Sequence, residues 1–545
     1  MKAVMKMSKV IAAILAFLEI FTVIGALGDY NYSIDAAAPG KAAGNKVSNV
    51  NVWEMGTQFI DARNESENDI YEFVEYVQLM QCTGGNEQRD LFADPLDRTV
   101  TDDYDFSRLI GNCRGILALG AKPCLKIGNT PLKLTQAPEI GGFGVNVLPP
   151  DDYDVYYDYI SARARALVDA FGREEVLRWH FTVFTEYENT DWFRCGTPEE
   201  TAAAFCKIYD YTVQALIDSI GEDVYVGAHS MTTTEGYWDE RDFIRHCAEG
   251  TNYKTGAQGT RLCCLSASYY ENEPGNTGKR KDLVQTVRHL RKAAEQYGLE
   301  LDYGVDEGRV LSSKPGKESA ELLSRTVGYR WQAAFDARLY AQCIENDIGY
   351  FSSWTYKSDG LNSGNPTLSF HVANLISKWK NAKILGVRRL PGGWIPGAEV
   401  KAIAAQDGDT LRIMAYNYKN DLSYSRSANL NLRIKNLPLE NGRVGATVYT
   451  IDDSCNYFDD WLADRERYGI DDSCFGWSPD CPNIAGSLKD AQARALYYGT
   501  LKADYAEKSK LVPTQTELEV KNGTLVLNTA LDANTVVFYE IRTEN

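Results

Sequence analysis

Strand-like and helix-like segments alternate along this chain between residues 46 and 385, and this alternation limits the possible folds more than any other feature. Short runs of apolar, β-branched and aromatic residues predict buried strands, and stretches with apolar residues at helical spacing follow them. The eight predicted strands are Val50–Met55, Val77–Cys82, Lys122–Ile127, Trp179–Phe184, Val224–Ala228, Leu262–Ser268, Leu301–Val305 and Gly349–Trp354. Strands that alternate with covering helices form a parallel sheet, and eight repeats are typical of a (β/α)8 barrel.

The pattern changes to short alternating strands at about residue 386. These are predicted at Val400–Ala404, Leu411–Tyr416, Leu430–Ile434, Val444–Ile451, Leu518–Val520, Leu525–Leu527 and Thr535–Ile541. Turn signals such as Asn441-Gly442 and Asn522-Gly523 separate them. The sequence therefore predicts an α/β chain, with a (β/α)8 TIM barrel at residues 46–385 and a C-terminal β-sandwich domain at residues 386–545.

The first 45 residues are predicted to be a signal peptide and a linker. Three lysines among the first nine residues precede the apolar run Val10–Leu27, which is typical of a secretory signal. Small residues at Ala26–Gly28 or at Ala36–Ala38 offer cleavage sites, and the Ala/Gly/Pro-rich segment Ala36–Gly44 is interpreted as a linker. An uncleaved membrane anchor is the alternative, because the run approaches the ~20 residues that span a bilayer. Glu19 in its middle disfavours that alternative, so we expect a secreted or cell-surface protein.

Charge and composition narrow the class of ligand. A net charge of −18 argues against nucleic acid, whose phosphates require Lys and Arg, and against anionic membrane surfaces. A neutral ligand fits best. Of the 12 cysteines, Cys455, Cys474 and Cys481 lie in a loop-rich stretch and are the best candidates for disulfides. The five histidines form no zinc-binding pattern, and we expect neither a metal nor a cofactor.

The predicted strand at Trp179–Phe184 is followed by two carboxylates and two aromatic residues, Glu186, Glu188, Trp192 and Phe193. Enzymes that cleave sugars use a carboxyl group to move protons and flat rings to stack on the apolar face of a pyranose. The alternative interpretation is a buried strand followed by a solvated acidic loop. The residues on either side of this stretch decide between the two.

Polar and aromatic residues follow nearly every predicted strand, at the end of the barrel where this fold places active sites. Those predicted to bind substrate are Glu54, Asn129, Thr185, His229, Tyr270, Trp354 and Tyr356. Two carboxylates, Glu186 and Glu307, end the fourth and seventh strands. Retaining glycoside hydrolysis needs two carboxyl groups ~5–5.5 Å apart, one to protonate the departing oxygen and one to attack the anomeric carbon. We assign Glu186 as acid/base and Glu307 as nucleophile, with Glu188 as a rival acid/base. Nearby Arg309 is expected to help Glu307 stay ionised.

The chain resembles glycoside hydrolase family 39 of clan A, the β-xylosidase and α-L-iduronidase group. The resemblance is carried by Trp179-His-Phe-Thr-Val-Phe-Thr-Glu186-Tyr at the fourth strand and Asp306-Glu307 at the seventh, and it extends from Asp105-Phe-Ser into the sandwich at Ile451-Asp-Asp-Ser-Cys. It implies that Glu186 is the acid/base and Glu307 the nucleophile. The family's Asn before the acid/base is Thr185 here, and its His on the sixth strand falls on Ser268. Its sugar specificity therefore does not transfer.

These observations together predict a retaining glycoside hydrolase that cleaves neutral glycosides by double displacement, with an oligosaccharide or glycoside as its partner. The resemblance implies a β-xylosidase-like enzyme. One alternative is a non-catalytic carbohydrate-binding protein derived from such an enzyme, because the motif at the fourth strand is altered. Another is a transglycosylase of the same fold.

Overall fold

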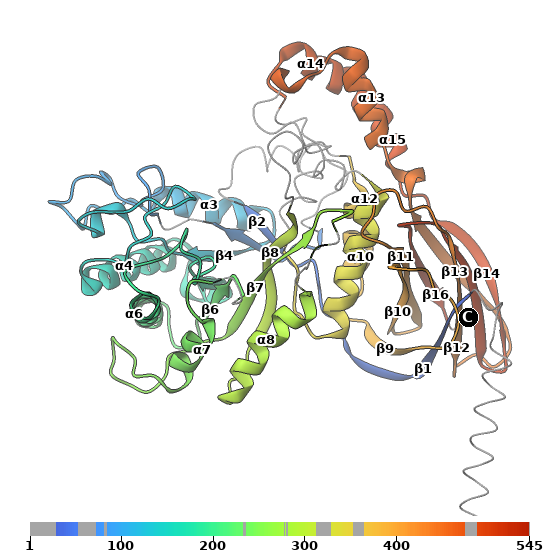
Figure 1. Cartoon of the computed structure of the whole chain (residues 1–545), viewed down its shortest axis with the longest axis horizontal. Helices are drawn as coiled ribbons and strands as arrows, with labels where there is room; N and C mark the ends of the chain where they lie inside the picture. Colours follow the sequence, from blue (N-terminus) through green and yellow to red (C-terminus); the bar gives the residue numbers. More distant parts are fainter. Residues whose placement is uncertain are drawn as a thin grey trace, which may run out of the picture.

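The computed structural model describes residues 29–52, 72–80, 84–232, 236–276, 278, 282–311, 329–352, 365–474 and 488–543. These residues form a mixed α/β protein with two large sheets, one parallel and one mostly antiparallel, that lie beside each other (Figure 1). Two helices stand between the sheets. A small helical part projects beyond the antiparallel sheet.

Seven strands in the described residues form a parallel sheet whose spatial order follows the sequence. They are β2 (Asn49–Val52), β3 (Tyr76–Leu79), β4 (Lys122–Ile127), β5 (His180–Val183), β6 (Tyr225–Ser230), β7 (Cys264–Asn272) and β8 (Asp302–Leu311). Each pairs in parallel with the next. Seven of the eight predicted barrel strands are thus present. In β7 and β8 the pairing continues beyond the predicted ends, so that Tyr270 and Glu307 lie within strands and not in loops.

The segment predicted as the eighth strand lies next to β8. Phe351 forms a parallel bridge with Val305, and the backbone N–H of Ser352 donates to the Val305 carbonyl at 2.8 Å. On the other side, the Phe351 N–H donates to the carbonyl of Lys46, just before β2, at 2.9 Å. Residues 351–352 therefore bridge the two edges of the sheet, giving a near-closed barrel as the (β/α)8 prediction requires.

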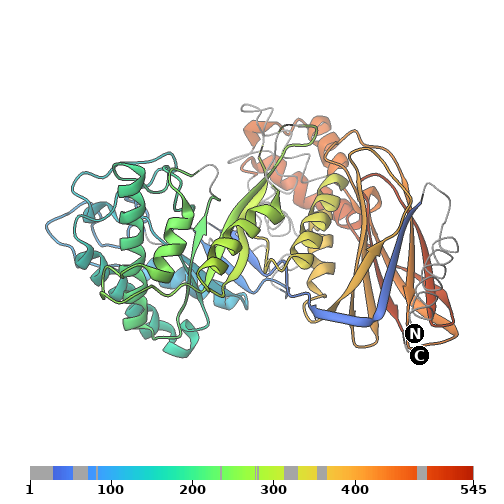
Figure 2. The same ribbon diagram turned by 60° about the horizontal axis from the view of Figure 1, so that its bottom comes forward.

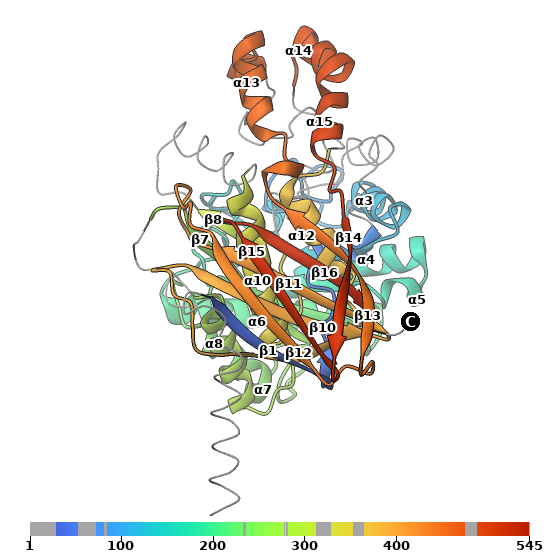
Figure 3. The same cartoon turned by 90° about the vertical axis from the view of Figure 1, so that its right-hand side faces the viewer.

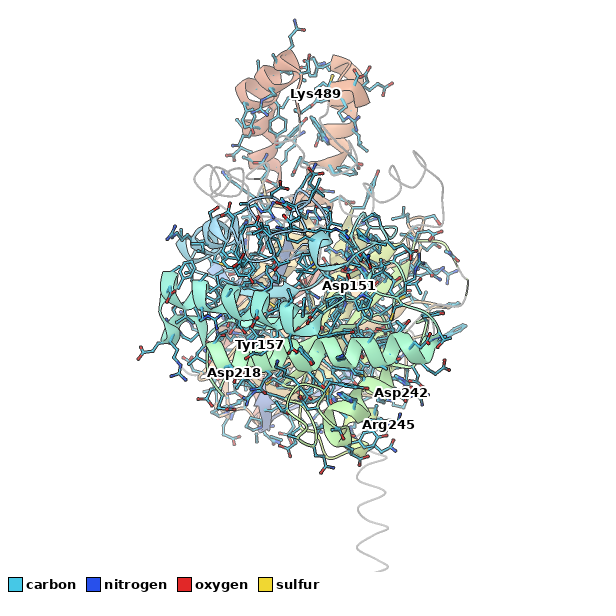
Figure 4. All side chains as sticks on the ribbon, turned by 90° about the vertical axis from the view of Figure 1, so that its left-hand side faces the viewer. Asp151, Tyr157, Asp218, Asp242, Arg245 and Lys489 are labelled. Atoms are coloured by element: carbon cyan, nitrogen blue, oxygen red, sulfur yellow. The ribbon has the colours of Figure 1, made fainter. Side chains whose placement is uncertain are left out.

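Helices cover the outside of the parallel sheet. They are α3 (Ser107–Ala118), α4 (Tyr153–Phe171), α5 (Arg173–Val176), α6 (Pro198–Ser219), α7 (Glu240–Glu249), α8 (Leu283–Gln296), α10 (Arg330–Glu345) and α12 (Leu368–Ser377). Helix α6 begins with a capping box, in which Thr197 and Glu200 exchange side-chain-to-backbone hydrogen bonds of 2.8 and 3.3 Å. Figure 4 shows α4 and α6 side by side, where the Tyr157 hydroxyl donates to Asp218 at 2.5 Å.

The antiparallel part is a nine-stranded closed sheet, seen from the side in Figure 3. Its order is β1 (Tyr30–Ala42), β12 (Ala428–Lys435), β15 (Thr524–Leu531), β14 (Thr514–Lys521), β13 (Gly442–Ile451), β16 (Val536–Arg542), β11 (Thr410–Tyr418), β10 (Glu399–Asp407) and β9 (Lys383–Arg389). All seven strands predicted after residue 385 are present. The β-rich second domain is confirmed, with its strands joined into one closed sheet in place of two separate ones.

The linker prediction for Ala36–Gly44 is wrong, because most of this segment belongs to β1. Every second residue at the start of β1 points into the interior of the closed sheet, namely Tyr30, Tyr32, Ile34 and Ala36. The period-2 pattern of a strand therefore begins at Tyr30. β1 runs parallel to β12 and antiparallel to β9. Figure 2 shows β1 passing along the closed sheet toward the parallel one. The β domain therefore takes strands from both ends of the chain.

The two sheets share one core through α10 and α12, which lie between them in Figure 1. Trp331 and Phe335 of α10 contact the ring of Tyr418 in β11. Arg338, also on α10, joins Glu271 of β7 at 3.3 Å and Glu399 of β10 at 3.1 Å. The guanidinium of Arg338 thus pairs with one carboxylate from each sheet and holds the β domain against the barrel.

The projecting helical part consists of α13 (Phe458–Tyr468), α14 (Ala491–Leu496) and α15 (Lys502–Lys508), seen at the top of Figure 1. Its small core is built around Trp461, Tyr497 and Tyr505. Cys455 and Cys474 are free thiols, which corrects the expectation that they form disulfides, and Cys481 lies outside the described residues. Within the described part of the chain, no helix combines the length and apolar character needed to cross a membrane.

Candidate active site

Glu186 lies in a tight turn directly after β5, at the carboxyl end of the parallel sheet. Its backbone adopts φ 43°, a left-handed conformation that is rare for residues other than glycine and is enriched at functional sites. Its Oε1 accepts a hydrogen bond from Ser268 Oγ at 2.6 Å and its Oε2 one from Asn189 Nδ2 at 2.7 Å. Asn189 Oδ1 accepts from the Asp191 N–H, which orients the amide so that its NH2 faces Glu186.

Glu307 lies in β8, where it is the register partner of Ser268 in β7. The Tyr270 hydroxyl donates to Glu307 Oε1 at 2.9 Å. Ser268 is the backbone register partner of Glu307 and its hydroxyl is hydrogen-bonded to Glu186, so both glutamates lie next to this one residue. Glu186 and Glu307 are far apart in sequence, and the parallel sheet brings them together.

The two carboxylates interact electrostatically. Burial, and next the charge of Glu186, raise the pKa of Glu307 to about 8, although Lys126 and the Tyr270 hydrogen bond act in the opposite direction. Because the charge of one carboxylate raises the pKa of the other, the two do not ionise independently, and the pair holds one proton around neutral pH. A carboxyl pair that shares one proton can supply an acid and a nucleophile together.

A buried hydrogen-bonded network lies beneath the pair. Lys126 Nζ contacts Asp306 Oδ2 at 2.6 Å and His229 Nδ1 at 2.7 Å. His229 Nε2 contacts Ser268 Oγ at 2.9 Å. His229 is 0% exposed and both of its ring nitrogens are engaged, so the prediction that it binds substrate is wrong.

The other predicted residues are placed as follows. Tyr270 contacts the nucleophile candidate, and Thr185 is buried beside Glu186. Asn129 is buried and donates to the carbonyl of Trp192 at 2.5 Å, so it holds the loop after β5. Arg309 pairs with Asp336 on α10 and not with Glu307, which corrects its predicted role. Glu54, Trp354 and Tyr356 lie outside the described residues.

Glu188, the rival acid/base, is closed off from solvent. Its Oε1 accepts from Ser230 Oγ at 2.6 Å. Burial, and then the nearby Glu240 carboxylate, raise the pKa of Glu188 to about 8. A buried carboxyl group without access to solvent cannot meet a substrate oxygen, so the geometry favours Glu186 over Glu188.

The aromatic residues that follow β5, Trp192 and Phe193, are buried as well, whereas the neighbouring ring of Phe143 is exposed. Trp192 is packed against Phe143, with ring centroids 4.4 Å apart and planes at 15°. Phe143 is 47% exposed although Trp192 covers one face, so its opposite face is open. Sequence reasoning missed Phe143 because it stands in a glycine-rich loop between predicted elements. The backbone N–H of Trp192 donates to the backbone carbonyl of Asn189, which links the Phe143–Trp192 ring pair to the turn that carries Glu186.

Comparison with known proteins finds similarity in sequence and in fold. A curated β-xylosidase from Caldicellulosiruptor saccharolyticus is 24% identical over 257 residues, which are 47% of this chain and 49% of that protein. The similarity thus spans about half the length of that relative. A family 39 enzyme from Xanthomonas axonopodis pv. citri has a similar structure, with a TM-score of 0.66 at 15% identity over 95% of this chain and 98% of that one. A monomeric β-xylosidase from Caulobacter crescentus CB15 has a TM-score of 0.64 at 16% identity, over 94% and 99% of the two chains.

The solved structures show that the parallel near-barrel and the β-rich domain form a known two-part fold. The profile of glycosyl hydrolases family 39 matches residues 95–392, which is more than half of the sequence and includes both Glu186 and Glu307. The chain therefore belongs to glycosyl hydrolases family 39.

Proposed function

We propose that this protein is a retaining glycosidase that cleaves neutral, β-xyloside-like glycosides by double displacement, with Glu307 as nucleophile and Glu186 as acid/base. The observation that carries the proposal is the convergence of the two carboxylates on Ser268, which is bonded to one and paired with the other. The net charge of −18 supports a neutral substrate, and the β-xylosidases among the relatives support a xyloside.

In the first step, Glu307 attacks the anomeric carbon while Glu186 gives its proton to the departing oxygen. This forms a covalent glycosyl ester on Glu307 and releases the alcohol. In the second step Glu186, now ionised, takes a proton from water, and the resulting attack breaks the ester with a second inversion. The Tyr270 hydroxyl stabilises the ionised form of Glu307 before attack.

The proposed mechanism needs the single proton that the carboxyl pair holds, and this gives a pH prediction. Because the pKa of Glu307 in the pair is raised to about 8, we expect kcat/KM to fall as pH rises above about 8, when the pair loses that proton. A second fall is expected on the acidic side, when both carboxyls are protonated. The measurement is kcat/KM for an aryl glycoside across pH. Activity that stays constant far into the alkaline range would contradict a shared catalytic proton.

Phe143 is expected to bind a sugar on the leaving-group side, because its open face is connected to the turn that carries the acid/base. Phe143→Ala should raise KM for oligosaccharides roughly fivefold, since stacking on an aromatic ring contributes about 1 kcal/mol, and should leave aryl monoglycosides unaffected. Ile140→Ala, an exposed apolar change in the same loop, is the control. Equal effects of Phe143→Ala on both substrate types would exclude this role.

The runner-up functions are a non-catalytic carbohydrate-binding protein and a transglycosylase. A panel of nitrophenyl glycosides separates the first from the enzyme, because a binding protein saturates with sugar without releasing nitrophenol. Product analysis at high acceptor concentration separates the second, since a transglycosylase yields mainly longer glycosides. We expect turnover with free sugar as the main product.

We further propose that the protein is exported and that its signal is cleaved near Ala26–Gly28. Cleavage at Ala36–Ala38 would divide β1, whose residues Tyr30, Tyr32 and Ile34 fill the interior of the closed sheet. Mass spectrometry of the secreted protein should therefore show a mature chain that retains Tyr30. A mature chain that begins after Ala36, or retention of the protein inside the cell, would contradict this.

A further inference from the structure

A line of hydrogen bonds leads from a buried ion pair to the acid/base candidate. It begins at Asp306 and Lys126, continues through His229 and Ser268, and ends at Glu186 Oε1. Its four contacts are 2.6, 2.7, 2.9 and 2.6 Å long. The members come from β8, β4, β6, β7 and the turn after β5, so the line passes through the interior of the barrel from one side to the other.

The chemistry of the donors gives this line one direction. A lysine ammonium only donates, so His229 Nδ1 must accept from Lys126 and cannot carry a proton. Neutral imidazole then holds its proton on Nε2, which donates to Ser268 Oγ. The only hydroxyl hydrogen of Ser268 is left for Glu186 Oε1. Each group thus orients the next.

Burial and charge support this protonation pattern. Burial, and next the charge of Lys126, lower the pKa of His229 well below its usual value, with Asp306 offsetting part of the effect. Although burial alone would raise it, Lys126 and a hydrogen bond from Tyr350 lower the pKa of Asp306 to about 2. Lys126 and Asp306 are therefore a charged pair, and His229 is neutral. The ionisable groups on the other side of Glu186 are Glu307 and its partner Tyr270.

We propose that Lys126, His229 and Ser268 are positioning residues that orient the Glu186 carboxyl group for proton transfer to and from the glycosidic oxygen. The proposal rests on the proposed function, because it explains how the carboxyl group of that same acid/base is oriented. The Ser268 hydroxyl donates a hydrogen bond to Oε1 of Glu186, and the Asn189 amide donates one to Oε2. Rotation of the carboxyl group would break both bonds, so its free lone pairs keep one direction, as pre-organised catalysis requires.

The test is Ser268→Ala, compared with Ser266→Ala as a matched control. Ser266 is also a buried serine on β7, and among the described residues its hydroxyl contacts the Ala228 carbonyl at 3.5 Å and no carboxylate. Each variant is assayed with two glycosides of the same sugar, one with a poor leaving group such as an alkyl alcohol and one with dinitrophenolate. Dinitrophenolate departs without a proton, so its kcat/KM does not depend on the acid.

For Ser268→Ala we expect kcat/KM to fall roughly tenfold with the poor leaving group, the effect of losing one hydrogen bond to a charged group, and to change little with dinitrophenolate. Ser268→Thr, which keeps the hydroxyl, should recover most of the loss, and Ser266→Ala should resemble the wild type. Equal losses with both leaving groups, or no loss, would overturn the positioning role. A wild-type protein without turnover of any glycoside would instead refute the proposed function, so the two failures are distinguishable.

Discussion

Glu307→Ala is expected to lower kcat/KM for every glycoside by on the order of 10⁴-fold or more, about 5 kcal/mol of transition-state stabilisation. The physical reason is that the variant has no group to attack the anomeric carbon. The side chain is partly buried and its pKa is raised, first by burial and then by Glu186, so its removal relieves repulsion and should not unfold the protein. Thermal unfolding of the variant provides the check on folding.

Added azide makes this prediction specific to the nucleophile. Azide can enter the space that Glu307 leaves and attack the anomeric carbon directly. One displacement inverts the configuration, so the product should be a glycosyl azide of inverted anomeric configuration, identified by NMR. Full activity of Glu307→Ala, or a retained glycosyl azide, would remove Glu307 as nucleophile.

Glu186→Ala is expected to give a loss that depends on the leaving group. For poor leaving groups, kcat/KM should fall about 10²–10⁴-fold, the usual contribution of a general acid. For dinitrophenyl glycosides it should change little, although kcat falls because no base activates water in the second step. Azide needs no base, so it should restore kcat and yield a glycosyl azide of retained configuration.

Glu188→Gln is the matched control for Glu186→Ala. Because burial and Glu240 raise the pKa of Glu188 to about 8, this carboxyl group is mainly neutral at pH 7, and an amide replaces it with little change in charge. We expect near wild-type kinetics with both leaving groups. If Glu188→Gln showed the leaving-group dependence and Glu186→Ala did not, the two assignments would have to be exchanged.

Much of the fold could be predicted from local sequence patterns. The strand Lys122–Ile127 occurs where it was predicted, because its signal lies in neighbouring residues. The capping box at Thr197 is likewise encoded within four consecutive residues. The strand β1 was missed because its second half, Ala36–Ala42, consists of Ala, Gly, Pro and Lys, which carry no strand signal. Helix α7 carries a weak sequence signal, because only a short apolar stripe, Phe243, Ile244 and Cys247, marks it among polar residues.

The candidate site was predictable only in part. The two glutamates could be proposed because each follows or lies in a strand with a recognisable pattern. The roles of Lys126, His229 and Ser268 could not, because a strand pattern shows which face a side chain occupies and not which distant strand it meets. Lys126 and Asp306 are 180 positions apart and join only through the closed arrangement of the parallel sheet. Arg309 was misassigned for the same reason, since its partner Asp336 is on α10.

The central claim is that Glu307 forms a covalent bond to the sugar while Glu186 does not. A 2-deoxy-2-fluoro glycoside with a dinitrophenolate leaving group slows the second step more than the first, so the intermediate accumulates. Proteolysis and mass spectrometry of the treated protein then locate the attached sugar. We predict one fluorosugar per chain, attached to Glu307. A sugar attached to another residue, or complete hydrolysis with inverted configuration and no attached sugar, would contradict the account.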